Sequence, residues 1–344
     1  MIFYIPKFRQ GGLEKVFTKY LLAISELHPV SLICDKSSKF FIDKTLLKGS
    51  KLKIIYISDN RFFRLLSLVF LIIFIYRNKS IHLVQLDAFK AGAILGIFLK
   101  LNLTYHERTY VNKKDRIIIS KLINYQRNSL KKIYVNSEDQ KCLFEKEFSN
   151  CIIERLHNPI INNLSVLEQT ISKKTIYPNS EIKIICSGRL DGQKNLEFIY
   201  KHAEIIVQKY RNAKIYMYLD DISFSKVSSN EYIKIKKFVT HDFYKELSDK
   251  HIAIVNTNFE GFSSQIFEYG IANLKIISTD HKHGLIEMKK EFDINTFEMG
   301  NIESLLNSLE KIKIADLNKI HKFNIDWAKN FLVQNSIDEF LTKL

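Results

Sequence analysis

The chain has little cysteine, and its cysteines are not arranged for a disulfide scaffold or a metal site. The four thiols, at Cys34, Cys142, Cys151 and Cys186, include no CxxC pair and none of the spacings typical of zinc ligands. Three of them lie in apolar runs, as core cysteines do. We therefore expect reduced thiols in a cytoplasmic protein, with no metal and no cofactor.

Glycine and proline are also scarce, with 11 and 4 residues among 344. This composition argues against a disordered chain and against an all-β fold that is rich in turns. Two signatures are missing as well: the GxGxxG fingerprint of a dinucleotide site and the GxSxG elbow of a Ser-His-Asp triad. We therefore predict neither a bound dinucleotide nor a serine nucleophile.

No apolar run is long enough to cross a membrane, which takes roughly 20 residues. The candidate that needs weighing, Leu65 to Tyr76, has 12 residues and is broken only by Ser67. Two interpretations stay open: a buried helix, or a helix that lies on a membrane surface and whose basic flanks bind anionic lipid. The flanking basic residues are Arg61, Arg64, Arg77 and Lys79. We expect no signal peptide, because the apolar stretch 1–5 is short.

The chain does have a packed core and a strong positive charge. Apolar residues make up 46% and charged residues 26%, and the length suits about two domains. The formal net charge of +15 favours acidic partners: nucleic acid, an anionic membrane face or phosphorylated ligands. Lysines are scattered along the chain and no known nucleic-acid motif is present, so we favour phosphorylated ligands over nucleic acid.

Short β-branched runs alternate with helical patterns along the whole chain, which predicts parallel sheets with helices on both faces. We expect a first domain over 1–160, a linker over 161–180 and a second domain over 181–321. The helical tail 322–344 is a candidate for returning to the first domain. The expected strands cover 2–5, 29–34, 52–57, 81–86, 102–105, 133–136, 181–186, 213–218, 233–238, 251–255 and 274–278.

Polar residues and glycines gather where the strands of the first domain end, which is where parallel sheets bind ligands. They are Gly11, Gly12, Asp87, His106, Arg108 and Ser137. Adjacent glycines let a ligand approach the backbone closely. A histidine at a strand end is more often structural, but this one could instead contact a substrate hydroxyl or a phosphate.

In the second domain, the strand 181–186 leads into a loop that holds Gly188, Arg189 and Lys194. The glycine permits a tight approach, and the two cations stand just before a helix, where phosphate oxygens would bind. A pair of surface charges is the alternative. The predicted phosphate site therefore has two cations on one loop.

The stretch Glu260 to Glu268 follows another buried strand and leads into a helix over 263–272. The first backbone N–H groups of a helix lack partners and lie at the positive end of its dipole, which favours a phosphate. Glu260 lies before the helix and Glu268 about one and a half turns into it. The two carboxylates could then reach opposite ends of an elongated ligand. Solvated surface carboxylates are the alternative.

Taken in order, these motifs resemble the GT-B glycosyltransferases of glycosyltransferase family 4. The residues that carry the resemblance are Gly11-Gly12-x-Glu14, His106, Ser187-Gly-Arg189 with Lys194-Asn195, and Glu260-Gly-Phe262 with Glu268; weaker matches are Asn136-Ser137 and Asn158-Pro159. The resemblance implies two Rossmann-like domains that face each other across a cleft. It also implies retaining sugar transfer from a nucleotide-sugar donor without an obligatory metal.

The resemblance assigns roles to these positions. Arg189 and Lys194 would neutralise the diphosphate, Glu268 would bind the ribose, and Glu260 would contact the donor sugar. His106 would lie beside the reacting sugar. The remaining donor-binding residues would be Gly11, Gly12, Gly188, Gly261, Phe262, Ser263 and Ser264, and the acceptor-side residues would be Asp87, Arg108 and Ser137.

Two positions depart from the family pattern. Asn273 replaces a usual glycine, and asparagine is the next most tolerant residue for positive φ. The strand end Tyr218-Leu-Asp-Asp221 lacks a glycine-rich turn, so UDP is favoured over GDP only weakly, and a metal-binding acidic pair there is not expected.

The acceptor that we expect is a glycan or lipid-linked hydroxyl in bacterial surface polysaccharide synthesis, such as capsule, O-antigen or lipopolysaccharide. The enzyme would be cytoplasmic, with peripheral contact to the anionic inner face of the membrane. The alternatives are a basic nucleic-acid-binding protein, a sugar-nucleotide-binding protein without catalysis, and a sugar-nucleotide epimerase.

Overall fold

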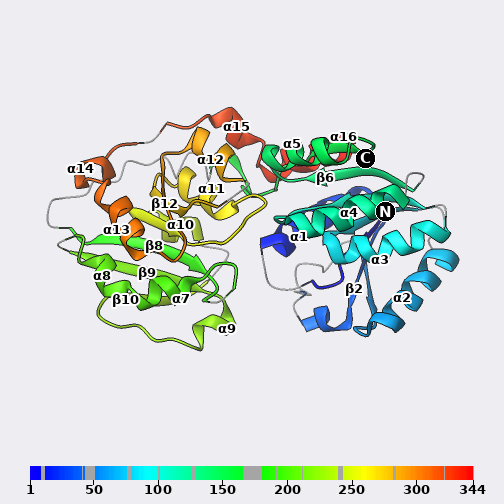
Figure 1. Ribbon diagram of the computed structural model, residues 1–344, viewed down its shortest axis with the longest axis horizontal. Helices are drawn as coiled ribbons and strands as arrows, with labels where there is room; N and C mark the ends of the chain where they lie inside the picture. The colour runs from blue at the N-terminus through cyan, green and yellow to red at the C-terminus, as the bar shows by residue number, and fades with distance from the viewer. Residues whose placement is uncertain are drawn as a thin grey trace. The chain divides into compact units, whose positions relative to one another are not determined.

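The computed structural model describes residues 1–8, 12–40, 42, 51–75, 79–99, 101–125, 129–165, 180–190, 192–210, 212–238, 243–281, 284–320 and 322–343 (Figure 1). The chain forms two compact units. The first comprises Met1–Asn162 and Lys329–Leu344, and the second comprises Asn163–Ala328. Most of the expected linker, 166–179, lies outside the described residues.

The first unit is built on a parallel sheet of seven strands in the order β3-β2-β1-β4-β5-β6-β7. Val30–Asp35 and Ile2–Tyr4 are buried along their whole length, as expected for parallel strands that are covered on both faces. The strands are β1 Ile2–Tyr4, β2 Val30–Asp35, β3 Leu52–Ile57, β4 Ser80–Val84, β5 Asn102–His106, β6 Leu130–Val135 and β7 Ile152–Arg155.

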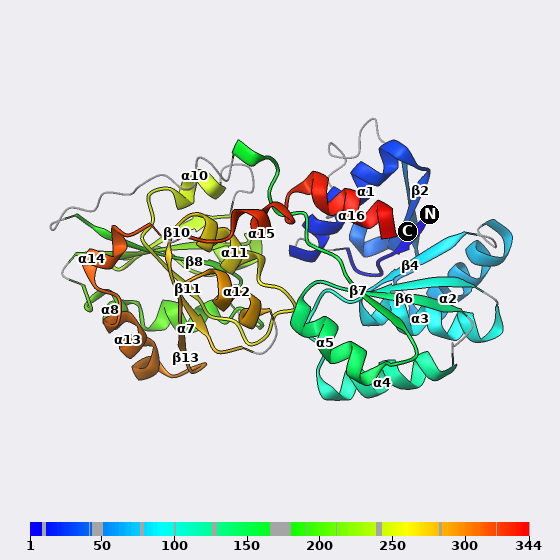
Figure 2. The ribbon, with the colours of Figure 1, turned by 90° about the horizontal axis from the view of Figure 1, so that it is seen from above.

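Successive residues of β1 point to opposite faces of this sheet and so enter two different core clusters. Ile2 and Tyr4 pack with residues of α2, α3, α4 and α5. Phe3 packs with residues of α1 and α16, so the C-terminal helix covers the same face as the first helix (Figure 2). The helices are α1 Gly12–Leu27, α2 Arg61–Phe70, η2 Leu71–Ile75, α3 Gln85–Phe98, α4 Lys113–Tyr125, α5 Glu138–Glu147 and α16 Val333–Lys343.

The second unit has a parallel sheet of six strands in the order β10-β9-β8-β11-β12-β13. Its strands are β8 Ile182–Gly188, β9 Ala213–Leu219, β10 Ile233–Lys237, β11 Ile252–Val255, β12 Lys275–Thr279 and β13 Ile294–Phe297. Its helices are α7 Leu196–Lys201, α8 Ala203–Val207, α9 Asp221–Phe224, α10 Phe243–Leu247, α11 Ser264–Ile271, α12 Leu285–Glu291, α13 Ile302–Glu310, α14 Ile314–Leu317 and α15 Ile325–Lys329.

Every predicted strand is present, with ends that differ by up to three residues. Sequence reasoning missed β7, β13 and α4. The predicted strand 81–86 ends at Val84 instead, because Gln85 has a φ of +70° and starts α3. Asp87 therefore lies in the first turn of a helix and not at a strand end, which corrects the prediction.

The helix that contains the apolar segment begins before Leu65, at Arg61, because Asn60 caps α2 and accepts a hydrogen bond from Phe62 N at 3.0 Å; Tyr76 lies outside the described residues. Leu68 and Ile72 are buried against the sheet, so this face of the helix packs in the core, as the buried-helix interpretation predicts. No helix in the described ranges is long and apolar enough to cross a membrane. The four cysteines are free thiols, and two of them, Cys34 and Cys186, are buried, where the sequence suggested three in the core.

The C-terminal helix is held to the first unit by Glu339 of α16. Its carboxylate accepts hydrogen bonds from the backbone N and the Nδ1 of His157, at 3.0 and 2.9 Å, and forms an ion pair with Lys343 at 2.5 Å. Burial alone would raise the pKa of Glu339, but the bonds from His157 and Lys343 outweigh it and lower the pKa to about 2. The native fold thus stabilises the ionised carboxylate.

We predict that Glu339→Gln destabilises the first unit by about 1–2 kcal/mol at pH 7, because two charge-assisted bonds are weakened. A carboxylate with a lowered native pKa stabilises the fold above its unfolded pKa, near 4.5, and this stability is lost as the pH falls toward 2. Thermal unfolding followed by circular dichroism should therefore show a difference from wild type that shrinks below about pH 4.5. Asp338→Asn, at an exposed neighbour on the same helix, is the control; an equal effect of both changes would contradict the assignment.

Candidate functional site

The residues of interest in the second unit lie where its strand order reverses. The chain runs from β8 outward to β9 and β10, and then returns to β11 on the other side of β8. Ligands of open α/β sheets bind outside the carboxyl ends of the strands at such a switch point. Lys194 follows β8 and Glu260 follows β11, so the topology brings these two loops together.

Gly188 ends β8 with a φ of +138°, a conformation that residues with a side chain rarely adopt. A Cβ atom at this position would lie 3.1 Å from Cγ of Lys194. The stem of Lys194 therefore passes directly over the backbone of Gly188. Gly188 thus makes room for the lysine, and its predicted part in donor binding stays a prediction.

Lys194 and Glu260 form an ion pair in which Nζ lies 2.5 Å from Oε1. Their side chains are 21% and 12% exposed, so the pair is only partly screened by water. Nζ also donates to Oε1 of Gln265 at 3.1 Å, and Thr257 Oγ1 donates to Oε1 of Glu260 at 3.1 Å. An ammonium group has three donors, and two of those of Lys194 are used by residues that the structure describes.

Gln265 connects this ion pair to the end of β8. Its Nε2 donates to the backbone O of Ser187 at 2.7 Å and to the hydroxyl of Tyr269 at 3.0 Å. Ser187 Oγ lies 2.9 Å from that same hydroxyl. Sequence reasoning missed Gln265. Two features of the sequence could have indicated it: Gln265 lies in the first turn of the predicted helix, and Tyr269, four residues later, lies on the same side of that helix.

The turn after Glu260 starts α11 as predicted. Ser263 is the N-cap and its Oγ accepts from Ile266 N at 3.4 Å, while Ser264 is the first helical residue. Gly261 and Phe262 are buried. Gly284, from the loop after β12, has a φ of +70°, and a Cβ there would lie 2.7 Å from the backbone O of Gly261. The backbone at Gly284 therefore packs closely against the turn that follows Glu260.

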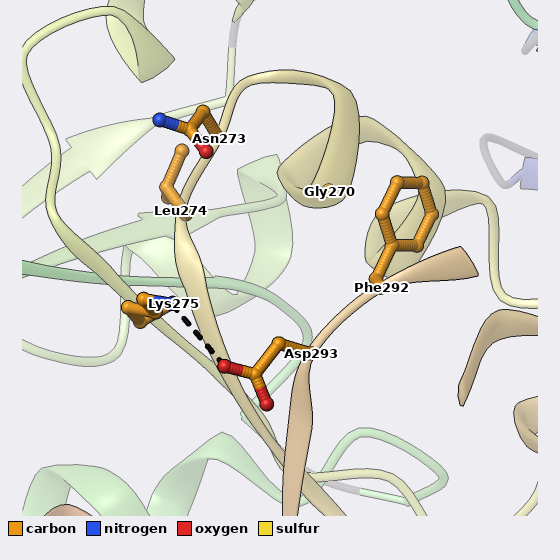
Figure 3. A pocket seen from close by; sticks show the side chains of 6 residues that line it. All are labelled: Gly270, Asn273, Leu274, Lys275, Phe292 and Asp293. Atoms are coloured by element: carbon orange, nitrogen blue, oxygen red, sulfur yellow. Dashed lines mark hydrogen bonds and ion pairs between the residues drawn. The ribbon is translucent and has the colours of Figure 1, made fainter. Parts of the chain in front are cut away.

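The C-terminal end of α11 confirms the expectation that Asn273 adopts a positive φ. Asn273 has a φ of +57°, so it serves where glycine is usual. Figure 3 shows the hollow beside it, of about 10 Å³, where Phe292 lies against Gly270 and Lys275 pairs with Asp293 at 3.2 Å. A hollow of this size holds about one water molecule and no sugar nucleotide.

Two other predicted donor residues are placed differently. Arg189 is exposed, and its side chain makes no hydrogen bond or ion pair with any residue that the structure describes. Glu268 is half-buried on α11, and after burial it is the second cause that raises the pKa of Tyr244. Asp220 caps α9 by accepting a hydrogen bond from Ser223 N, and Asp221 pairs with Lys237 at 2.9 Å, so each has a structural partner.

The first unit does not present His106 to a ligand. Its ring is fully buried, and Nε2 lies 3.0 Å from Nδ1 of His82. Burial holds its pKa well below the usual value. The rings of Phe3, Phe17, Tyr134 and Phe340 lie within 5.0–6.2 Å of it, between centroids. This placement agrees with the structural alternative and corrects the expectation of direct contact with a sugar.

Arg108 and Ser137 are buried in the same unit. Nη1 of Arg108 donates to the backbone O of Leu156 at 2.6 Å and to Asn158 Oδ1 at 3.3 Å. Ser137 caps α5, as predicted, by accepting from Gln140 N at 3.4 Å. Arg108 therefore ties the loop after β5 to the loop after β7, whereas Ser137 acts locally at the start of α5.

The other predicted residues of the first unit are less informative. Asp87 is exposed on α3, and Gly12 is the exposed first residue of α1 with open space around it. Gly11 lies outside the described residues. The predicted cleft between the domains stays a prediction.

Comparison with known proteins identifies the architecture. No protein-family model matches the chain, and no curated protein resembles it in sequence. The fold of the chain does match solved structures. Anabaena Alr3699/HepE in complex with UDP-glucose has a TM-score of 0.72 at 13% identity, over 100% of this chain and 99% of that one. The chain has the GT-B fold.

Two further structures support the GT-B assignment. The lipopolysaccharide outer core galactosyltransferase WaaB, in its apo form, has a TM-score of 0.67 at 12% identity and covers 100% of this chain and 99% of its own. A glycosyltransferase from Rickettsia africae ESF-5 has a TM-score of 0.66 at 16% identity, with 99% and 96% covered. At these identities the likeness establishes the GT-B fold alone.

We predict that Gly284→Ala destabilises the second unit more than Gly300→Ala does. The two glycines have nearly the same φ, +70° and +73°, so both changes carry a similar backbone strain of about 1–2 kcal/mol. Only at Gly284 does the new methyl group meet a backbone atom, because the space around Gly300 is open. Urea unfolding followed by the fluorescence of the single tryptophan, Trp327, compares them directly; equal costs would show that this loop does not support the Glu260 turn.

Proposed function

We propose that the protein is a retaining glycosyltransferase of family 4 that transfers a hexosyl or N-acetylhexosaminyl group from a nucleotide-sugar to a hydroxyl of a glycan or lipid-linked acceptor. The observation that carries the proposal is the Lys194–Glu260 pair at the switch point of the second sheet, beside the first turn of α11. A cation, a carboxylate and the positive end of a helix are what a sugar diphosphate requires.

The chemistry follows from the charge that develops on the leaving group. As the glycosidic bond breaks, the diphosphate gains negative charge, and fixed cations that face it lower the barrier. Lys194 has a third N–H that no described residue uses, and exposed Arg189 supplies a second cation to the same loop. These groups would stabilise the leaving group without a metal.

Glu260 has a different part in the proposal. When the donor binds, the diphosphate competes with Glu260 for the ammonium of Lys194. The carboxylate is then available to accept hydrogen bonds from the hydroxyls of the donor sugar. We do not assign it as a nucleophile; we propose that the acceptor attacks the same face of the sugar and that the leaving phosphate takes its proton.

The donor is more consistent with UDP than with GDP. The HepE structure, which shares the fold, binds UDP and UDP-glucose. Glu268, half-buried one turn along α11, is placed on the helix that would carry the nucleoside end of the donor and is proposed to bind the ribose. The acceptor would be made in bacterial surface polysaccharide synthesis, because WaaB, which shares the fold, acts on lipopolysaccharide.

We expect Lys194→Met to lower the release of UDP from UDP-sugars by about 100-fold, because one fixed positive charge is lost from the leaving group. The measurement is nucleotide release across a panel of UDP- and GDP-sugars. Lys201→Met is the matched control, since Lys201 also pairs with a glutamate, Glu197, at 2.7 Å, but on the exposed surface of α7. Unchanged transfer by an Arg189→Ala, Lys194→Ala double variant would refute the assignment.

The first unit offers a surface for peripheral contact with an anionic membrane. Five aromatic and aliphatic side chains of α2 and η2 are 49–72% exposed: Phe62, Phe63, Leu66, Phe70 and Phe74. A groove of about 420 Å³ runs between β3 and α2. Lys53 of β3 and Arg61 of α2, the two elements that line the groove, are both exposed. An apolar face with a basic rim is the pattern of a helix that lies in a membrane interface.

A Phe63→Ser, Phe70→Ser double variant should lose binding to vesicles that contain phosphatidylglycerol. Wild type should float with these vesicles at low salt and be released at about 1 M salt, where electrostatic attraction is screened within about 3 Å. Ile222→Ser, at an exposed isoleucine of α9, is the control. If wild type ignores anionic vesicles even at low salt, the membrane proposal is wrong.

A further inference from the structure

The loop between β12 and α12 lies against the turn that carries Glu260. Thr279 Oγ1, at the end of β12, donates to the backbone O of Thr257 at 2.6 Å and accepts from Thr257 N at 3.1 Å. Five residues later, Gly284 touches the backbone of Gly261 and Phe262. Thr279 and Gly284 thus both lie against the segment that carries Glu260, and His281 follows Thr279 by two positions.

His281 lies on this loop and has a buried ring with one unpaired nitrogen. The residue is 7% exposed, and its Nδ1 lies 3.0 Å from the backbone O of Thr279. A carbonyl can only accept, so Nδ1 carries the hydrogen and Nε2 has the lone pair of a neutral ring. Nε2 is buried, and no residue in the described part of the chain bonds to it. Buried polar atoms nearly always have a partner, so this one suggests that a ligand is missing.

The charges around His281 come from three segments. Burial is the largest influence and lowers its pKa; Glu260 and Asp280 oppose this, while Lys194 adds to it. Asp280 itself pairs with Lys289 of α12 at 3.1 Å. The ring is therefore neutral at neutral pH when the ion pair is its neighbour.

A diphosphate would meet a site with little net charge. Lys194 and Glu260 cancel each other, and the other basic residue of the β8–α7 loop is Arg189, whose side chain is exposed. A bound diphosphate brings at least two negative charges into partly buried surroundings, where an opposite charge strongly favours the protonated form of a nearby imidazole. The unpaired Nε2 is the one atom of His281 that can accept a proton.

We propose that His281 is a donor-binding residue that takes up a proton on Nε2 when the diphosphate of a nucleotide binds beside Lys194, and that the new N–H then donates to a phosphate oxygen. The proposal rests on the proposed function, because it requires that diphosphate. The proton comes from the solvent and returns to it when the nucleotide leaves, and no covalent bond other than N–H forms or breaks. His281 would thereby restore the positive charge that Glu260 cancels on Lys194.

The test is calorimetric titration of the full-length protein with UDP and with GDP near pH 7, in two buffers of different ionisation enthalpy. The difference between buffers gives the number of protons taken up on binding. We expect wild type to take up a fraction of a proton that is lost in His281→Gln, with an affinity about ten- to a hundredfold weaker, as for loss of a hydrogen bond to a charged group. Protonation of the nucleotide itself contributes equally to both proteins and cancels.

His202→Gln is the matched control, because His202 also has Nδ1 held by a backbone carbonyl, that of Phe198 at 2.8 Å, but lies between α7 and α8. Trp327 fluorescence during urea unfolding shows whether each variant is folded. Equal affinity and proton uptake in wild type and a folded His281→Gln would overturn the proposal and leave the glycosyltransferase assignment intact. Weaker binding with unchanged proton uptake would also overturn it, since a contact without protonation would explain that. If folded wild type binds neither nucleotide, this proposal and the proposed function both fail.

Discussion

The site depends on one interaction, the ion pair between Lys194 and Glu260. Its two residues are 66 positions apart and come from the loops after two neighbouring strands, β8 and β11. Gly188 makes room for the lysine stem, Gln265 holds the ammonium and the end of β8 at once, and Thr257 holds the carboxylate. Partial burial strengthens the attraction between the two charges. Because the charges cancel, however, the ion pair by itself attracts an anion only weakly. The proposed exchange of partners on donor binding, and the proposed protonation of His281, both follow from this balance.

The two units use their polar strand-end residues in different ways. In the second unit, they remain near solvent and hold charges in a defined arrangement. In the first unit, His106 and Arg108 are turned into the protein, where they bond to His82 and to the backbone of Leu156. The aromatic residues of α1 and α16 enclose His106 from the same face of the sheet. A histidine or arginine at a strand end is thus a weak guide to a ligand site, since the same position suits a buried polar bond.

The exposed face of α2 supports the proposed contact with an anionic membrane. The net charge of +15 is spread over the sequence, but the large apolar side chains of α2 and η2 are concentrated on one helical surface. Monomeric proteins rarely leave such a patch to water without a use for it. The buried stripe of the same helix, Leu68 and Ile72, packs on the sheet, so the buried-helix interpretation holds for that face, while contact of the exposed face with a membrane stays a proposal.

What the sequence alone determined is local. β-Branched apolar runs predicted the strands, Ser137 and Ser263 predicted helix starts, and Asn273 was read as a position of positive φ, because each of these depends on the conformational preferences of a few adjacent residues. The ordered motifs also predicted the fold class. The tertiary structure alone decided that Lys194 pairs with Glu260, that Gln265 and His281 belong beside them, and that His106 is buried. These facts depend on which strands are neighbours and which helices cover them, and a side chain's partner or burial across such distances has no signature in the residues next to it.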